Sequence, residues 1–498
     1  TLPAASVRNL DGSTPGTTNQ FTGTGTKTLY VWKPTANTST SVEITGTINN
    51  VIDPTGASIE VIQLPDYPMT TVRNNYMSGE YVGAFWKANQ KGERIIRIPV
   101  GNGTIRSGNW DASVYWMGPG WNVGDIVFSN DTSDDTGITY NSSTENPANM
   151  LINDATYVVP GYVSSASGTA TSGAGNYIHF RIGLTTTYTP TINNPARYAL
   201  VLLRYGTPQK YHIIYIRQGD GADYLMHPND NARGSAAVRF CAYNTTASDL
   251  TNSDELVEIL SDRSNAVFTD YPTQAGALFQ WSAIPPYGPL AYNPVTPISV
   301  KIWNEVPIGS YWNTLQASSE SCPPGYRRPN DGSTSGPAAN NTSVIIRSSE
   351  IRQSLYATPM TDDKNNNTNI RWGFYADGYF DRRDHNNPFM ASPGEGGSGM
   401  ATNTAVSWKT INVGYIGSLL FNPLAGSSRE NASLFIPAAG DRHGETGALV
   451  EAGEAALILS SSALNAIDMW YFVGTPILGA QQLASTRRHA LSLRCVPL

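Results

Sequence analysis

The sequence has few charged residues. Only 14% of its 498 residues are Asp, Glu, Lys or Arg, compared with about 25% in an average soluble domain. The 32 basic and 39 acidic residues give a formal net charge of −7 and are spread thinly along the chain. A nucleic-acid backbone and an anionic bilayer both bind concentrated positive charge, so neither is expected as a partner.

Long apolar runs are also absent. A membrane-spanning helix needs roughly 18 consecutive apolar residues, and the longest candidates, Tyr198–Leu203 and Ala455–Leu459, are far shorter. We therefore expect no transmembrane segment in this chain. The sequence starts at Thr1 without a signal sequence, which is typical of a mature product or of a chain whose targeting segment is missing.

Glycine, uncharged polar residues and aromatic residues are abundant instead. With 40% apolar and 10% aromatic residues, the chain can bury the cores of two to four domains and is not intrinsically disordered. A neutral polar composition is typical of extracellular β-proteins, so we expect export. The three cysteines, Cys241, Cys322 and Cys495, allow one disulfide and one free thiol, and their number alone does not decide the compartment.

The first half of the chain alternates between apolar and polar residues, as in half-buried β-strands. In the clearest example Trp110, Ala112, Val114 and Trp116 would line one face of a strand, and Asp111, Ser113 and Tyr115 the other. Further strands are predicted at Ser41–Ile48, Glu93–Val100, Tyr177–Gly183, Arg197–Tyr205 and Tyr211–Gln218.

The last two of these predicted strands are joined by the turn-forming residues Gly206–Gln209 and should form a hairpin. The tract Ser164–Gly175 contains mostly small residues and is predicted to be a mobile loop. We predict an antiparallel β-sandwich region over residues 1–226, built as one elaborated domain or as two small ones.

After Met226 the pattern changes. Ser253, an acidic first turn and apolar residues at i, i+3 and i+4 predict a helix over Asp254–Asp262. A second short helix is predicted at Ser349–Tyr356. We therefore predict an α+β domain over residues 227–498 in a chain that is mainly β.

Several segments of this second domain resemble a known family. They are Ser321–Gly332 (SCPPGYRRPNDG), Phe435–Gly447 (FIPAAGDRHGETG), Leu457–Ser462 with Trp470–Phe472, and Leu491–Leu498 (LSLRCVPL). In this order they resemble the C-type-lectin-like paralogous domain found on surface proteins of Bacteroidota and Fibrobacter. The resemblance covers roughly Phe268–Leu498 and implies a C-type-lectin-like α+β fold. It also implies a disulfide between Cys322 and Cys495.

The segment before that domain carries a second resemblance. Tyr211–Met226 (YHIIYIRQGDGADYLM) looks like the closing strand and linker of sandwich domains in Bacteroidota surface and fimbrial accessory proteins. The order of the two domains is similar to that of fimbrial accessory or tip proteins. This implies other fimbrial or surface subunits as partners, and a host or bacterial surface protein or glycan as a ligand. The residues alone are equally well explained by a strand that ends in a turn.

Motifs of enzyme chemistry are absent. No G-x-S-x-G, H-E-x-x-H, P-loop or dinucleotide-binding motif occurs. The six histidines are isolated in the sequence, and the tripeptides with which C-type lectins bind calcium are missing, so we predict no metal and no cofactor. The same fold family includes formylglycine-generating oxidases, which need a reactive cysteine pair. Cys241 has apolar and aromatic neighbours and is predicted to be a buried, inert thiol.

One segment is a candidate binding surface. Arg371–Asn387 (RWGFYADGYFDRRDHNN) mixes aromatic rings with charged groups, which suits stacking on sugars or a protein interface. The alternative is a hairpin with Asp377-Gly378 as its turn and its aromatic rings directed inward. Loop 440–447 would add polar groups if the two loops lie side by side. The candidate binding residues are Trp372, Tyr375, Asp377, Tyr379, Arg382, Arg442 and His443.

These observations and resemblances together predict a non-enzymatic adhesion or recognition protein, exposed at the cell surface in a fimbria or at the outer membrane. The main alternative is a non-fimbrial surface lipoprotein that binds glycans for nutrient capture. An oxidase of the formylglycine-generating type is the third and least favoured hypothesis.

Overall fold

The structure of the chain is a computed structural model. In residues 1–83 it describes the backbone of short strands alone, and for β21 and β22 below it likewise describes only the backbone. The other described residues are 84–101, 106–130, 163–207, 209–225, 237–251, 253–294, 302–303, 317–331, 348–355, 373–377, 380–381, 417–422, 432–463, 467–474 and 481–498.

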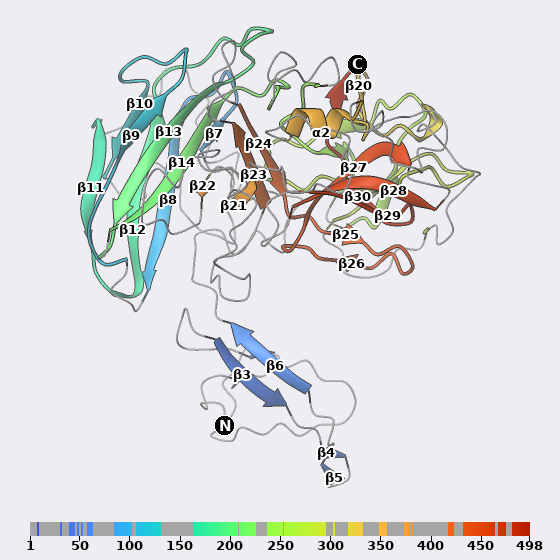
Figure 1. Cartoon of the computed structure of the whole chain (residues 1–498), viewed down its shortest axis with the longest axis horizontal. Helices are drawn as coiled ribbons and strands as arrows, with labels where there is room; N and C mark the ends of the chain where they lie inside the picture. The colour runs from blue at the N-terminus through green and yellow to red at the C-terminus, as the bar shows by residue number, and fades with distance from the viewer. Residues whose placement is uncertain are drawn as a thin grey trace.

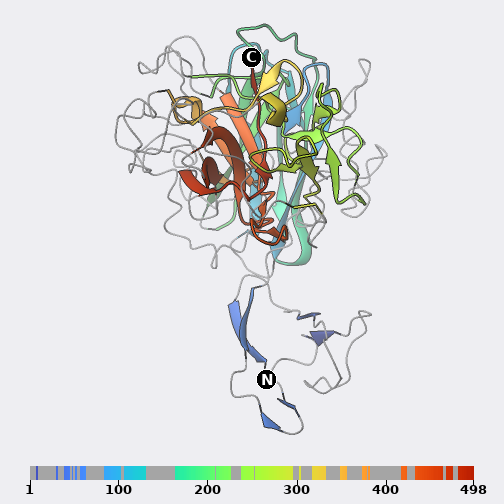
Figure 2. The ribbon, with the colours of Figure 1, turned by 90° about the vertical axis from the view of Figure 1, so that its right-hand side faces the viewer.

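The short strands near the N-terminus form three antiparallel pairs, β1–β2, β3–β6 and β4–β5. Figures 1 and 2 show β3 and β6 apart from the rest of the molecule. The six strands are β1 (Val7–Arg8), β2 (Tyr30–Val31), β3 (Ser39–Ile44), β4 (Thr47–Ile48), β5 (Val51–Ile52) and β6 (Ala57–Ile62).

Residues 84–225 are called the N-terminal region below. Their described strands pair antiparallel, with one short parallel pairing, β7 on β14. A three-stranded sheet has the order β10-β12-β8, and the strands β11-β9-β13-β14 begin a nine-stranded sheet. The strands are β7 (Phe85–Trp86), β8 (Gly92–Gly101), β9 (Gly108–Met117), β10 (Ile126–Ser129), β11 (Ser165–Ala170), β12 (Gly173–Leu184), β13 (Arg197–Tyr205) and β14 (Lys210–Gln218).

Both sheets contribute to one core. Phe128 and Phe180 from the three-stranded sheet belong to the same buried cluster as Val201 and Leu203 from the larger sheet. A bridge between Phe128 and Val163, just before β11, connects the two sheets, so the β-structure curls round on itself (Figure 1). Burial of these apolar side chains is the main source of stability in such a fold.

Two predictions in this region are confirmed. On β9 the side chains of Trp110 and Ala112 are buried whereas Tyr115 is exposed, as the alternation predicts. The predicted hairpin is β13–β14, with Arg197 opposite Gln218 at one end and Tyr205 opposite Lys210 at the turn.

The prediction of a mobile loop at Ser164–Gly175 is wrong. Most of the tract is the edge strand β11 and the start of β12, and Gly168 of β11 lies opposite Trp110 of β9. A Cβ atom on Gly168 would lie 2.8 Å from the Trp110 ring. The small residues therefore leave room for a large ring on the neighbouring strand, a packing relationship that composition alone does not reveal.

Residues 237–498, called the C-terminal region below, contain many short strands. The four-stranded sheet has the order β16-β19-β18-β30, and a three-stranded sheet has the order β27-β28-β29. Its first elements are β15 (Thr245–Ala247), β16 (Leu256–Glu258), β17 (Ala266–Phe268), β18 (Leu278–Phe279), β19 (Leu290–Tyr292), the 3-10 helix η6 (Ala317–Ser319), β20 (Tyr326–Arg327), α2 (Glu350–Leu355), β21 (Gly373–Asp377) and β22 (Phe380–Asp381).

The remaining strands lie in the last 82 residues, and the terminal ones return to the beginning of the region: β30 pairs with β18, and β31 pairs with β20. They are β23 (Gly417–Asn422), β24 (Ala432–Pro437), β25 (Asp441–Arg442), β26 (Leu449–Val450), β27 (Ala456–Ala463), β28 (Asp468–Gly474), β29 (Gln481–Thr486), β30 (Leu491–Ser492) and β31 (Val496–Pro497).

Of the two predicted helices one is confirmed. Helix α2 matches the prediction at Ser349–Tyr356. Its N-cap residue is Ser349, whose Oγ accepts from Arg352 N at 3.0 Å, and Asn330 Oδ1 accepts from Glu350 N at 3.0 Å. The helix predicted over Asp254–Asp262 is wrong. The segment contains strand β16, which pairs with β19, and Asp254 Oδ2 accepts from Thr251 N at 2.8 Å in the preceding turn. The short apolar pattern of this segment is compatible with a helix or a strand, and pairing with the distant strand β19 makes it a strand.

The larger sheet continues from one region into the other. After β14 its order is β22-β21-β23-β24, and Ile214 of β14 lies opposite Phe380 of β22. The division into domains at residue 226 remains a prediction from sequence. Among the described residues no helix is long and apolar enough to cross a membrane.

Candidate functional site

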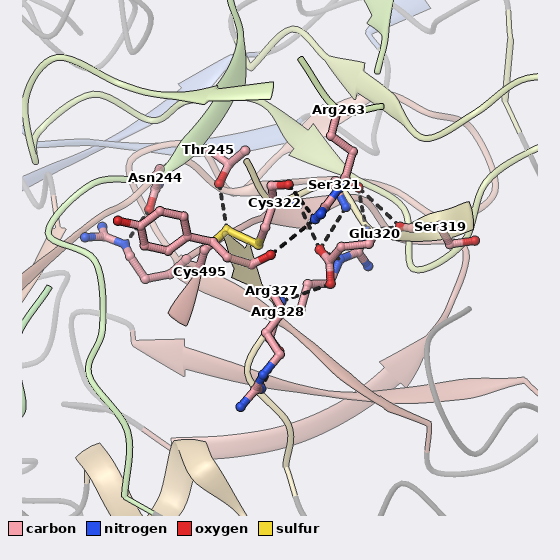
Figure 3. Close-up of a disulfide and its surroundings, with 12 residues drawn as sticks. Asn244, Thr245, Arg263, Ser319, Glu320, Ser321, Cys322, Arg327, Arg328 and Cys495 are labelled. Carbon is pink, nitrogen blue, oxygen red and sulfur yellow. Dashed lines mark hydrogen bonds and ion pairs between the residues drawn. A yellow bond between two sulfur atoms is a disulfide. The ribbon is translucent and has the colours of Figure 1, made fainter. Parts of the chain in front are cut away.

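The sequence segments that carry the family resemblance meet around a disulfide. The structure joins Cys322 to Cys495, the pair that the resemblance implies, with their Cα atoms 6.0 Å apart and both side chains fully buried. In Figure 3 the carboxylate of Glu320 lies beside this bond and accepts from the backbone N–H groups of Ser321 and Cys322 at 2.8 and 2.9 Å. Arg263 Nη1 donates to the carbonyl oxygen of Cys322 at 3.0 Å.

Two arginines of these segments, Arg328 and Arg494, are buried and donate to the backbone. Arg328 donates to the carbonyl oxygens of Trp281 and Ser319, each at 3.0 Å. Arg494 donates to Phe435 O at 2.8 Å. Desolvation lowers the pKa of Arg328 to about 10, which still leaves the side chain charged at neutral pH. These side chains hold the scaffold together and are not available to a ligand.

Arg442 belongs to the same class. It is fully buried, its Nη1 donates to Gly447 O at 2.8 Å, and its other nitrogens donate to Asn293 O. Desolvation lowers its pKa to about 10. We therefore remove Arg442 from the candidate binding residues and assign it a structural role.

The segment Arg371–Asn387 is described only in part. Trp372, Tyr379 and Arg382 lie outside the described residues, and Tyr375 and Asp377 are placed by their backbone in β21. Strands β21 and β22 pair as an antiparallel hairpin, with Asp377 opposite Phe380. The hairpin alternative is thus the observed backbone arrangement, with residues 378–379 between the paired strands. It lies inside the large sheet, next to β14.

His443 lies in a polar cluster that also contains Asp441 and His489. The Nδ1 atom of His489 lies 2.5 Å from Asp441 Oδ2, and the rings of His443 and His489 are 5.4 Å apart between centroids. Both imidazoles are partly exposed. We call Asp441, His443, Glu451, Tyr471 and His489 the histidine cluster.

Two backbone features bring the cluster together. An antiparallel bridge pairs Arg442 with Ala490, which brings His443 and His489 side by side, and the His489 side chain also contacts Asp441, 48 residues earlier in the chain. Gly444 follows in the loop, and a Cβ atom there would lie 2.9 Å from His489 Cδ2 and from Arg488 Cβ. Trp303 Nε1 donates to Gly444 O at 2.9 Å on the same loop. The absence of a side chain at Gly444 therefore allows the close approach of the two histidines.

The cluster offers both donors and acceptors. An ionised carboxylate can only accept, so His489 Nδ1 is the donor in its contact with Asp441. His443 Nδ1 accepts from Glu445 N at 3.4 Å, which leaves N–H on its Nε2 when the ring is neutral. Desolvation, followed by the charges of Glu451 and Asp441, raises the pKa of Tyr471 to about 12, so this hydroxyl keeps its proton.

Glu451 contributes an acceptor at the edge of the cluster. Desolvation, with smaller contributions from the carboxylates of Asp441 and Glu454, raises its pKa above the ordinary value of 4.5. The cluster therefore carries carboxylates beside imidazole and phenol groups, a combination that can bind hydroxyl, amide or amine groups. Within the described ranges no group of three or more His, Cys, Asp or Glu side chains is placed to hold a metal ion.

Sequence reasoning found His443 and the loop 440–447 that contains Asp441, but it missed the other three members of the cluster, His489, Tyr471 and Glu451. Glu451 follows that loop by four residues, whereas Tyr471 and His489 lie 24 and 42 residues after it. The available signal was the position of His489 directly before the LSLRCVPL segment, which carries part of the family resemblance.

Cys241 is the free thiol that the sequence predicts to be inert. It is buried, and desolvation raises its pKa from 9.0 to about 12. Its backbone N–H donates to Cys495 O at 3.0 Å, so it lies close to the chain around the disulfide.

This raised pKa predicts a loss of stability at alkaline pH. Below about pH 9 the thiol is protonated in both the folded and the unfolded chain, whereas between pH 9 and 12 it is protonated only in the folded chain. The free energy of unfolding should then fall by up to roughly 1.4 kcal/mol per pH unit. Denaturant titrations at pH 8 and pH 10 check this, and Cys241→Ala should remove that part of the slope. An identical slope in the variant would contradict the prediction.

No protein-family model matches the chain, and neither does any curated protein sequence. The function has to be argued from the arrangement of the residues themselves.

Proposed function

We propose that this chain is a non-enzymatic recognition protein of the bacterial cell surface, of the fimbrial accessory or tip type. In this proposal the N-terminal β-sandwich acts as a stalk and subunit contact, and a C-type-lectin-like domain presents the recognition surface. One observation carries it: the segments that resemble the family build a buried scaffold, and the histidine cluster lies partly exposed on a loop of that scaffold.

The state of the cysteines argues against the oxidase hypothesis. Two of the three form a buried disulfide, and the third is a buried thiol with a pKa raised to about 12. Oxidases of that type need a reactive cysteine pair, and a thiol with so high a pKa is almost entirely protonated at neutral pH. A structural disulfide also supports a location in an oxidising compartment, outside the cytoplasm.

The donors and acceptors of the histidine cluster suit a polar ligand surface. Asp441 and Glu451 accept, and Tyr471 and His443 donate, so a surface protein or glycan rich in hydroxyl and amide groups would be complementary. The nutrient-capture hypothesis predicts a different result, namely tight binding of a free oligosaccharide by the chain without any fimbrial subunit.

Removing the two imidazoles should weaken recognition. For the double variant His443→Ala, His489→Gln we expect about 30-fold weaker binding to surface proteins or glycans, equivalent to about 2 kcal/mol for a central contact. Binding of the purified chain to glycan arrays and to isolated surface fractions measures this effect. The exposed residue Val123, in the N-terminal region, offers a control, and Val123→Ala should bind as the unchanged chain does.

Thermal stability must be followed in the same variants. Unchanged binding by a stably folded double variant would contradict the assignment of the histidine cluster. To test the fimbrial role, cross-linking on intact cells followed by mass spectrometry should identify fimbrial subunits. Recovery of no fimbrial subunit, together with tight binding of a free oligosaccharide, would favour nutrient capture instead.

A further inference from the structure

The segment Arg217–Asp223 lies at the end of the N-terminal region, where the chain leads toward the C-terminal region. By sequence it resembles a closing strand followed by a linker, and a linker would allow the regions to move independently. In the structure its polar groups form hydrogen bonds with residues of both the N-terminal and the C-terminal region. We propose that this segment is a rigid joint, which fixes the orientation of the C-terminal region against the large sheet.

Arg217 is the centre of the joint. Its guanidinium is fully buried and donates to Gly219 O at 2.9 Å and to Gly221 O at 3.0 Å, which holds the segment in its own turn. The same group donates to the Tyr198 hydroxyl at 2.9 Å and to Ser433 O at 2.8 Å. Tyr198 is on β13 and Ser433 is on β24, so one side chain connects both regions and the segment between them.

Asp223 completes the network. The Tyr198 hydroxyl accepts from Arg217 and donates to Asp223 Oδ2, so an arginine and a carboxylate are linked through one phenol. The backbone of Asp223 pairs with that of Phe240 in both directions, at 3.0 and 2.8 Å. Charge-assisted hydrogen bonds of this kind are shorter and stronger than neutral ones, and a buried network of them favours a single geometry.

The backbone of the segment has little room to move. Gly219 has a φ of +126°, and a Cβ atom there would lie 2.4 Å from Pro195 O. Its N–H donates to Trp86 O at 2.8 Å, and the N–H of Arg217 donates to Ala84 O at 2.9 Å. A side chain at Gly221 would also meet Pro195, at 2.8 Å. The glycines therefore permit close packing here and do not act as flexible spacers.

Apolar packing acts in the same direction. The buried cluster of the N-terminal region includes Tyr243, Leu419 and Phe435 from the C-terminal region, and the Phe85 and Tyr243 rings meet edge to face at 5.9 Å. The large sheet also passes from β14 to β22. The apolar contacts hold the two regions together, and in this proposal the Arg217 network fixes the angle at which they meet.

The joint can be tested with a distance distribution across it. Spin labels on Val123→Cys and Ile467→Cys, two exposed positions in the two regions, would report their separation by pulsed electron resonance. The native cysteines should not react, since two form the disulfide and Cys241 is buried. In the labelled chain we expect one narrow distribution.

Arg217→Lys and Tyr198→Phe are the test variants. A lysine ammonium cannot donate to all four acceptors of the Arg217 guanidinium. Phenylalanine at position 198 removes only the hydroxyl that links Arg217 to Asp223. Both should broaden the distribution, by more than twofold for Arg217→Lys, while circular dichroism stays unchanged. Arg204→Met is the matched control, because this arginine of β13 pairs with Asp111 on the exposed face, and its distribution should stay narrow.

Two results would overturn the proposal. One is a broad or multiple distribution in the labelled chain with both residues intact. The other is a narrow distribution in Tyr198→Phe and in any folded Arg217→Lys protein. Tyr198→Phe removes only one oxygen atom. If Arg217→Lys does not fold, the distance distribution of Tyr198→Phe alone still tests the proposal.

Discussion

Replacing Cys322 and Cys495 together by alanine is expected to lower the free energy of unfolding by about 5 kcal/mol. The disulfide closes a loop between residues 173 positions apart, and in the chain-entropy model a loop of this length restricts the unfolded chain by about that amount. The bond also lies in the core that contains Leu493 and Trp281, where its loss would loosen packing. Denaturant unfolding with and without the substitutions measures the difference.

Cys241→Ala is the matched control for the disulfide. It removes one buried sulfur from the same core but opens no loop, so the loss should be about 1 kcal/mol. A reductant added to the unchanged chain in denaturant should reproduce the effect of the double substitution. A loss below 2 kcal/mol in the Cys322/Cys495 variant would show that the disulfide is not central to the scaffold.

Asp331→Ala is expected to cost about 3–5 kcal/mol, because it leaves a charged arginine buried without its carboxylate. Asp331 and Arg352 are both buried, with Arg352 Nε 2.8 Å from Asp331 Oδ1. The same carboxylate accepts from Ser349 Oγ at the start of helix α2. Loss of the carboxylate therefore affects the ion pair and the attachment of the helix together.

Two further variants separate these contributions. In Asp331→Leu, Arg352→Met both charges are replaced by apolar groups, and most of the loss should be recovered. Asp111→Ala is the exposed counterpart, since the Arg204 and Asp111 side chains are 48% and 32% exposed, and its loss should stay below about 1 kcal/mol. A double variant as unstable as Asp331→Ala would show that the carboxylate acts mainly through Ser349.

Prediction from sequence succeeded where a local pattern of residues is compatible with only one secondary structure. The hairpin of β13 and β14 could be predicted because two apolar runs flank Gly206 and Pro208, and β9 could be predicted from the alternation around Trp110 and Ala112. The pair Cys322–Cys495 came from the resemblance and agrees with the structure. In these cases the residues that decide the structure are close in sequence or carry a recognised motif.

Prediction failed where a distant partner decides the structure. The spacing of Leu256, Val257 and Ile259 suits a helix, but residues 290–292 pair with this segment and make it a strand. The small residues around Gly168 suggest a loop until the Trp110 ring is placed above them. Neither partner can be identified from the local sequence.

The candidate site shows the same limit. From the sequence, Arg442 is expected to be an accessible polar group in loop 440–447. In the structure its guanidinium donates to the carbonyl oxygen of Asn293, 149 residues earlier in the chain. His489 could not be assigned to the site because its contact with Asp441 depends on the pairing of Arg442 with Ala490. The adhesion function and the surface location remain proposals that rest on the resemblance and on the histidine cluster.

The return of the last strands to the first strands of the C-terminal region has a consequence for folding order. Leu491 and Ser492 pair with Phe279 and Leu278, and Leu493 O accepts from Thr245 N at 2.9 Å. Contacts between residues so far apart in the chain form slowly. While the ribosome adds residues one by one, β15 and β18 can pair with the nearby strands β17 and β19, but their contacts with residues 491–493 need a part of the chain made more than 200 residues later. This region can therefore close its core only after residues 490–497 have emerged.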